Sequence, residues 1–191
     1  MIRQTLLSVF AVLILGGTAA ACKAGGVGDP CIPNDEFAAN YEGSKVTEVQ
    51  IEDRSFQCET RVCLVKNFQG RVTCPFGNPA GNSVYDGPDR ECMVPGTNAQ
   101  VTAAVKPQCR DRKDAVYCSC RCDGTDSNAK YCECPDGYEC KEVVNSLDPN
   151  LVRPGDKYCV KKGDNFDKDC AEDTCDVAAD HCGYSSNMQE L

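Results

Sequence analysis

The residues of this chain with the most evident chemistry are its seventeen cysteines. Five of them form two closely spaced runs, Cys118-x-Cys120-x-Cys122 and Cys132-x-Cys134. Thiolates at such spacings can bind zinc or copper(I), whereas in an oxidising compartment the same sulfurs pair as disulfides. Because the N-terminal segment predicts export, we expect disulfides here, with no metal and no other cofactor.

The other reactive side chains do not indicate catalysis. His181 is the single histidine, and the sequence holds no G-x-S-x-G, H-E-x-x-H or phosphate-binding glycine loop. A Cys–His nucleophile pair would need a free cysteine, which an even set of disulfide partners disfavours. We therefore predict that the protein is not an enzyme and has no catalytic residue.

Two binding activities remain as alternatives. The acidic tail, residues 163–191, offers carboxylates that suit calcium, of which Asp167, Asp169 and Asp173 are weak candidates. The tail lacks a glutamate-closed D-x-D-x-D-G loop, so a solvated acidic surface is the preferred interpretation. The segment 77–96 could instead present Arg90 to the pocket of a trypsin-like protease, in the manner of a small disulfide-rich inhibitor.

Composition explains why so many sulfurs are needed. The chain has 170 residues after Ala21, and only 27 of them are Val, Ile, Leu or Phe. That share, about 16%, ordinarily indicates disorder. Disulfides, which contribute typically about 2–4 kcal/mol each, can replace the missing apolar core. The net charge of −9 argues against a nucleic-acid partner, because binding phosphates requires a basic surface.

Together these features predict a small disulfide-rich fold, mainly β-hairpins with long loops and little helix. Residues 46–52 alternate so that Thr47, Val49 and Ile51 share one face of a strand. Similar signals predict the remaining elements of the first region: strands at 56–65 and 71–76, a turn at 67–70, a loop at 77–96, and a short strand or helical turn at 101–105.

The second cysteine-rich region predicts the most regular element. Residues 116–122 alternate cleanly, with Val116 and three cysteines on one face of a strand and polar residues on the other. Residues 123–129 have the composition of a turn, and 131–134 return with the same alternation. We expect a β-hairpin with five cysteines on its inward face, where they stand in for aliphatic side chains.

The segment from Cys132 to Cys140 reads C-E-C-P-D-G-Y-E-C. Over these nine residues it resembles the closing part of EGF-like and related extracellular modules, which read C-x-C-x-x-G-[FY]. The resemblance implies a tight turn at Asp136 and Gly137 that packs Tyr138 beside disulfides.

The N-terminal segment predicts a cleaved secretory signal over residues 1–21. Arg3 precedes the apolar run from Leu6 to Leu15, and small residues follow as far as Ala21. The run is too short to span a bilayer, which takes about 20 residues.

The end of that signal, Ala20-Ala21-Cys22, resembles the lipobox of bacterial lipoproteins, in which the cysteine after the cleaved bond is lipidated. The resemblance implies a membrane anchor on Cys22. The cysteine count agrees, because setting Cys22 aside leaves an even number, sixteen. We expect these sixteen to form disulfides: Cys31, Cys58, Cys63, Cys74, Cys92, Cys109, Cys118, Cys120, Cys122, Cys132, Cys134, Cys140, Cys159, Cys170, Cys175 and Cys182.

The expected organisation is one elongated unit or two modules divided near residue 105. Its five segments are a signal peptide (1–21), a lipidated Gly-rich tether (22–30), a first disulfide-rich region (31–105), a hairpin region (106–162) and an acidic tail (163–191).

The function we expect is that of a non-catalytic exported lipoprotein. It would present an acidic, disulfide-stapled domain at the bacterial outer membrane or cell surface, for adhesion, envelope organisation or binding of a protein or polysaccharide partner. In style the chain is similar to uncharacterised envelope lipoproteins of myxobacteria, a likeness that implies location more than activity. The alternative is a secreted or periplasmic inhibitor-like or calcium-binding module without lipid.

Overall fold

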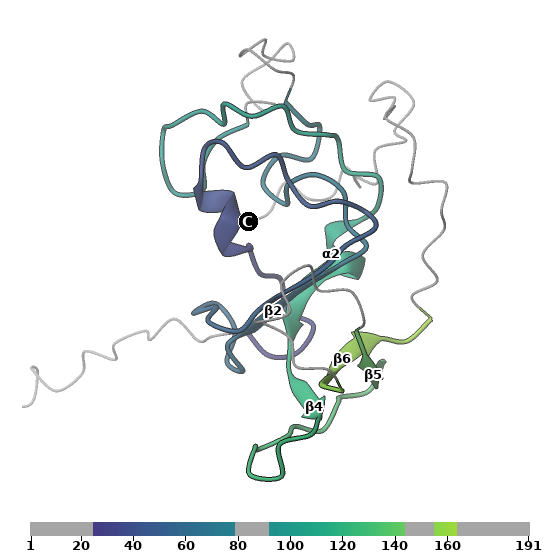
Figure 1. Ribbon diagram of the computed structural model, residues 1–191. Helices are drawn as coiled ribbons and strands as arrows, with labels where there is room; N and C mark the ends of the chain where they lie inside the picture. Colours follow the sequence, from purple (N-terminus) through teal and green to yellow (C-terminus); the bar gives the residue numbers. More distant parts are fainter. Residues whose placement is uncertain (1–24, 79–91, 144–154, 164–191) are drawn as a thin grey trace, which may run out of the picture.

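The computed structural model describes residues 25–78, 92–143 and 155–163 (Figure 1). They form two three-stranded antiparallel sheets joined by long loops, in the orders β1-β2-β3 (the first sheet) and β4-β6-β5 (the second sheet). This arrangement, with its disulfides, confirms the predicted mainly-β, disulfide-rich fold class. In chain order the elements are η1 (Asn34–Phe37), β1 (Val49–Glu52), β2 (Val62–Lys66), α2 (Arg112–Ala115), β3 (Val116–Ser119), β4 (Arg121–Asp123), β5 (Tyr138–Glu142) and β6 (Lys157–Lys161).

The two helical elements within the described ranges, η1 and α2, are single turns. Of the helices within the described ranges, none has the length and apolar character needed to cross a membrane.

The central strand of the first sheet, β2, is covered on both faces. Leu64 pairs with Ile51 of β1, and Cys63 pairs with Cys118 of β3. Neighbouring residues of a strand point to opposite faces, so Cys63 and Leu64 belong to different cores. The first four residues of β2 are all buried, which explains why this strand lacks a polar–apolar alternation.

Each face of the first sheet packs against its own cluster of buried side chains. One cluster mixes sulfur with aliphatic and aromatic groups: Cys31, Cys58, Cys63, Val65, Phe68, Val72, Ala115, Val116 and Cys118. The other contains no cysteine and joins the two sheets: Val49, Ile51, Val62, Leu64, Tyr117, Val143, Tyr158 and Val160.

The second sheet is more open. Its central strand β6 has three buried residues of five, whereas three of the five residues of the edge strand β5 are exposed. On the other edge, the pairing of β4 with β6 shifts register between Arg121 and Asp123. In Figure 1 this sheet lies below the first, with β4 at the end of the chain that leaves β3.

The chain passes from one sheet to the other through Cys120. The backbone N–H of Cys159 donates to the carbonyl of Cys120 at 3.0 Å, and Ser119 Oγ donates to the carbonyl of Cys159 at 2.7 Å. Two residues later along β6, the N–H of Lys161 donates to the hydroxyl of Tyr117 at 3.0 Å. These bonds dock β6 against the end of β3, so that the two sheets meet at a fixed junction.

The predicted hairpin of residues 116–122 and 131–134 is wrong. Residues 131–134 form no strand, and β4 pairs with β6 instead. A single backbone hydrogen bond, from Cys132 N to the carbonyl of Arg121 at 3.1 Å, links the two segments. The alternation is real within β3, but it ends where the chain crosses between sheets, so Cys118 lies in one core and Cys120 in another.

Other predicted elements are confirmed in part. The first strand begins at Val49, and Thr47 is exposed. The second begins only at Val62, after a loop, and residues 71–76 form turns rather than a strand. The turn implied by the EGF-like resemblance is present: Tyr138 N donates to the carbonyl of Pro135 at 3.0 Å, and Gly137 has φ of 87°.

The segment that the sequence suggests as a flexible tether is hydrogen-bonded to the rest of the fold through Gly25, Gly28 and Asp29. Gly25 forms a parallel bridge with Cys58. Gly28 N donates to the carbonyl of Cys118 at 2.8 Å, and Cys118 N donates to the carbonyl of Asp29 at 2.7 Å. From Gly25 onward, this segment is part of the fold.

Candidate functional site

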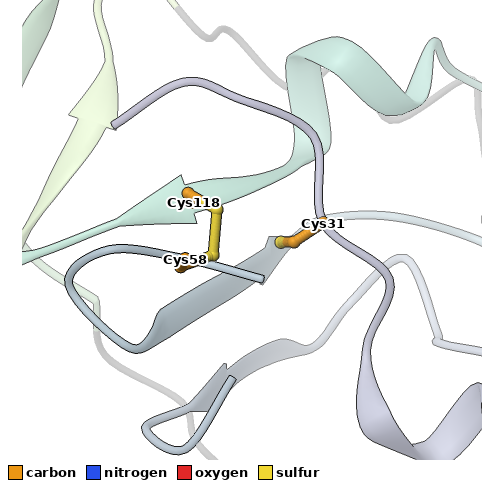
Figure 2. A group of neighbouring side chains, drawn as sticks. All are labelled: Cys31, Cys58 and Cys118. Atoms are coloured by element: carbon orange, nitrogen blue, oxygen red, sulfur yellow. A yellow bond between two sulfur atoms is a disulfide. The ribbon is translucent and has the colours of Figure 1, made fainter. Parts of the chain in front are cut away.

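Three cysteines from distant parts of the chain meet on one face of the first sheet (Figure 2). Cys118 lies on β3, Cys58 in the loop before β2, and Cys31 in the N-terminal segment, with their Sγ atoms within 4.8 Å of one another. Cys58 is bonded to Cys118, and Cys31 to Cys63. All four are at most 2% exposed, so these two bridges are closed to solvent.

A second group of sulfurs lies against the second sheet. It consists of three disulfides, which we call the six-sulfur cluster: Cys120–Cys132, Cys122–Cys140 and Cys134–Cys159. Sulfurs of different bridges touch. The Sγ atom of Cys159 lies 3.4 Å from that of Cys120 and 3.9 Å from that of Cys132. Those of Cys122, Cys134 and Cys140 lie within 4.8 Å of one another.

The six-sulfur cluster runs from the surface to the interior. Cys140 is exposed, and Cys122 and Cys134 are half-buried. At the other end, Cys120 and Cys159 are 3% and 0% exposed. One end of this sulfur chain is therefore open to water, in contrast to the bridges of the first sheet.

The disulfides bear on the alternative of a metal cluster at the described cysteines. Each of the three groups with metal-like spacing contains both sulfurs of one bridge and a third sulfur from another bridge. A bridged sulfur carries no thiolate charge, so it is not a ligand of the kind that zinc or copper(I) requires. All thirteen cysteines in the described ranges, including Cys109, are disulfide-bonded.

Charged side chains surround the second sheet. Asp156 accepts a hydrogen bond from Arg121 at 3.1 Å, which raises the pKa of the guanidinium. Lys157 donates to the exposed carboxylate of Asp123 at 2.6 Å and lowers the pKa of that carboxyl. The other oxygen of Asp156 is buried and accepts no hydrogen bond from the residues that the structure describes. These contacts orient the strands of the second sheet.

A buried polar network ties η1 to the segment after β2. Glu36 accepts hydrogen bonds from the backbone N–H groups of Val72 and Thr73, and the guanidinium of Arg71 donates to the carbonyls of Glu36 and Ala38. Burial raises the pKa of the Glu36 carboxyl above its ordinary value, against the lowering effect of these hydrogen bonds and of Arg71. Because both side chains form hydrogen bonds with backbone atoms, we interpret the network as structural.

One loop places an aromatic side chain in water. Residues 53–61, the Phe56 loop, carry Phe56 with 81% of its surface exposed. The guanidinium of Arg61 stacks 4.1 Å from the ring centroid, and Arg61 adopts the left-handed backbone conformation, with φ of 68°. Such a conformation is unusual for a residue other than glycine and costs of the order of 1 kcal/mol.

The Phe56 loop is rigidly held at its base. Cys58 is bonded to Cys118, and the side-chain amide of Gln57 both donates to and accepts from the backbone of Ile32, at 2.7 and 3.0 Å. Thr60 Oγ1 donates to the carbonyl of Ser119. The aromatic side chain is therefore presented by a preorganised loop. Sequence reasoning missed this feature, and its only signal was a phenylalanine in an otherwise polar run.

Several predicted residues lie outside the described ranges. They are the lipidation candidate Cys22, the inhibitor candidate Arg90, the calcium candidates Asp167, Asp169 and Asp173, the tail cysteines Cys170, Cys175 and Cys182, and His181.

Comparison with known proteins adds no relative. No protein-family model, curated protein or solved structure matches the chain.

Proposed function

We propose that this protein is a non-catalytic exported lipoprotein. It is anchored in the bacterial outer membrane or at the cell surface through a lipid on Cys22, and it presents an acidic, disulfide-stapled domain for adhesion, envelope organisation or partner binding.

The observation that carries the proposal is the balance of cysteines. Twelve of the thirteen described cysteines pair among themselves, and the thirteenth, Cys109, is also bonded. Of the seventeen in the sequence, the others are Cys22, Cys170, Cys175 and Cys182. If Cys22 carries lipid, Cys109 and the three tail cysteines form an even set, and no sulfur is left over.

Disulfide bonding supports export independently of the signal sequence. Bridges of this density persist in oxidising compartments such as the periplasm and the cell surface, and are rare in a reducing cytosol. An apolar-poor chain also depends on them for its stability. The chemistry of the folded domain and the secretory character of residues 1–21 thus agree.

The Phe56 loop is the surface that best suits partner binding. Exposed aromatic side chains and arginines are enriched where proteins bind partners. A preorganised loop also loses less conformational entropy on binding than a flexible one. The loop therefore supports the partner-binding part of the proposal as a candidate contact surface.

The test is the intact mass of the mature protein, expressed in a Gram-negative host with its own N-terminal segment. We expect a chain that begins at Cys22, carries acyl chains and has no free thiol. A Cys22→Ser variant should lose the acyl mass, whereas a Lys23→Ser variant, changed one residue further on, should retain it. A mature wild-type chain without acyl chains and with one free thiol would overturn the lipoprotein proposal.

A further inference from the structure

We propose that the Cys122–Cys140 bridge is a site of thiol–disulfide exchange for small external thiols, and that the six-sulfur cluster carries the exchange inward. This inference goes beyond the envelope role and does not rest on it, because it uses only the geometry of the second sheet.

The first step follows from exposure. An external thiolate attacks the Sγ atom of Cys140, the exposed member of the cluster. A bond forms between the external sulfur and Cys140, the Cys122–Cys140 bond breaks, and its electron pair leaves on Cys122 as a thiolate. Exchange of this kind is governed by access to the attacked sulfur and by thiolate character. Among the described residues, β5 is an edge strand of the second sheet, and Cys140 is one of its exposed residues.

The second step follows from the contacts between bridges. The new thiolate on Cys122 lies within 4.8 Å of Cys134 Sγ. Its attack there forms Cys122–Cys134 and releases Cys159 as a thiolate. Cys159 Sγ lies 3.4 Å from Cys120 Sγ, and attack on that atom forms Cys120–Cys159 and releases Cys132.

Taken together, the three exchange steps are redox-neutral. One external thiolate is consumed, one mixed disulfide forms on Cys140, and one protein thiol appears on Cys132. The number of disulfide bonds is unchanged, so no oxidant is required. Each transfer moves a bond between sulfurs that already lie close together, so the sheet need not unfold.

The three bridges outside the cluster that have both cysteines in the described ranges lack such an access route. The four cysteines of the first sheet's two bridges are at most 2% exposed, and Cys74 and Cys92 are 3% and 6% exposed. An external thiol reaches them only after the surrounding core opens. The structure therefore predicts an order of reaction, with Cys140 first.

The experiment treats the oxidised full chain with reduced glutathione in buffer without denaturant. Samples are acid-quenched over time, free thiols are alkylated, and the bridges are mapped by mass spectrometry. We expect the first glutathione adduct on Cys140, followed by the new pairings Cys122–Cys134 and Cys120–Cys159 with a free thiol on Cys132. The bridges Cys58–Cys118 and Cys31–Cys63 should remain intact.

A pair of double variants isolates the role of the exposed bridge. In Cys122→Ala/Cys140→Ala, we expect adduct formation on the remaining cysteines of the cluster to slow by about tenfold or more, because the accessible sulfur has gone. The matched control is Cys74→Ala/Cys92→Ala, which removes a buried bridge of the same sequence separation, 18 residues. This control should react at Cys140 as fast as the unmodified chain.

The wild-type time course alone is decisive, even if a double variant does not fold. Adduct formation first on a cysteine of the first sheet would overturn the proposal. So would the loss of all bridges at one common rate, which would mean that exchange requires global unfolding. An adduct on Cys140 with no new pairing would overturn the inward relay.

Discussion

The two sheets build their interiors in different ways. In the first, β2 is buried on both faces, and its two bridges lie among Val65, Phe68 and other apolar side chains. In the second, β5 is mostly exposed, and three disulfides in mutual contact tie the sheet together and to the segment 131–134. The first sheet uses disulfides to reinforce a core, and the second uses them as the core.

This difference shows how a chain with few aliphatic residues distributes them. Most of the clustered buried apolar side chains lie around β2 and at the junction of the two sheets, and a smaller third cluster surrounds Cys74, Cys92 and Val101. Their burial removes apolar surface from water. The outer part of the second sheet receives few of them. Disulfides stabilise this part of the sheet instead, and they persist in an oxidising compartment without being buried away from water.

The largest expected effect compares one bridge from each sheet. Removal of Cys58–Cys118, which closes 60 residues, should lower the free energy of unfolding by about 4 kcal/mol from chain entropy, with a further loss from the cavity left in the core. Removal of Cys122–Cys140, which closes 18 residues, should cost about 3 kcal/mol with little cavity cost. Urea unfolding of the two double-alanine variants measures both. Equal losses, or a larger loss in the second sheet, would contradict the distinction between reinforced core and sulfur core.

A second comparison concerns the pH dependence of stability that two carboxyl groups contribute. The folded chain raises the pKa of Glu36, so its carboxyl favours folding most below its ordinary pKa, and this contribution is lost as pH rises through the folded pKa. Asp123 behaves in the opposite sense, because its pKa is lowered: its contribution is present above the ordinary pKa and lost as pH falls through the folded pKa.

Two neutral variants measure these opposite signs. Urea unfolding is compared between about pH 7 and about pH 2, a window that extends below the ordinary pKa of both carboxyls. Relative to Glu36→Gln, the wild-type protein should gain stability as the pH falls. Relative to Asp123→Asn, it should lose a smaller amount, since the exposed Asp123–Lys157 pair is screened by solvent. Changes of the same sign for both variants would refute this assignment.

The smallest expected effect lies within the first region and compares two phenylalanines. Phe56→Ala should change the free energy of unfolding by less than about 0.5 kcal/mol, because its ring is already in water. Phe68→Ala removes a ring that is 0% exposed and should cost about 3–5 kcal/mol. A large loss of stability for Phe56→Ala would mean that the Phe56 loop serves the fold rather than a partner.

Residue composition was sufficient to predict the fold class, since a chain with so few aliphatic residues and so many cysteines has few other ways to fold. The pairing of sulfurs could not be predicted in the same way. Cys63 and Cys118 are opposite one another in the first sheet, yet each is bonded to a different loop cysteine. Only the long-range geometry of the folded chain determines that choice.

The predicted hairpin failed for a related reason. Alternation around Cys120 reports which way side chains point, but it carries no information on which strand lies alongside. In the structure, β4 pairs with β6, which is more than thirty residues away along the chain. The exposure of Phe56 could not be predicted from the sequence either, because a lone phenylalanine is more often buried than exposed.

The hydrogen bonds of the N-terminal segment also define a path for mechanical load. Gly25 bonds to the backbone on either side of Cys58, and Gly28 and Asp29 bond to Cys118. A pull from the N-terminal end is thus divided between the two ends of a single covalent bridge, which ties β3 to the loop before β2. Tension on this segment would be carried by these hydrogen bonds and by the bridge behind them, so a force from the N-terminal end would reach β3 directly.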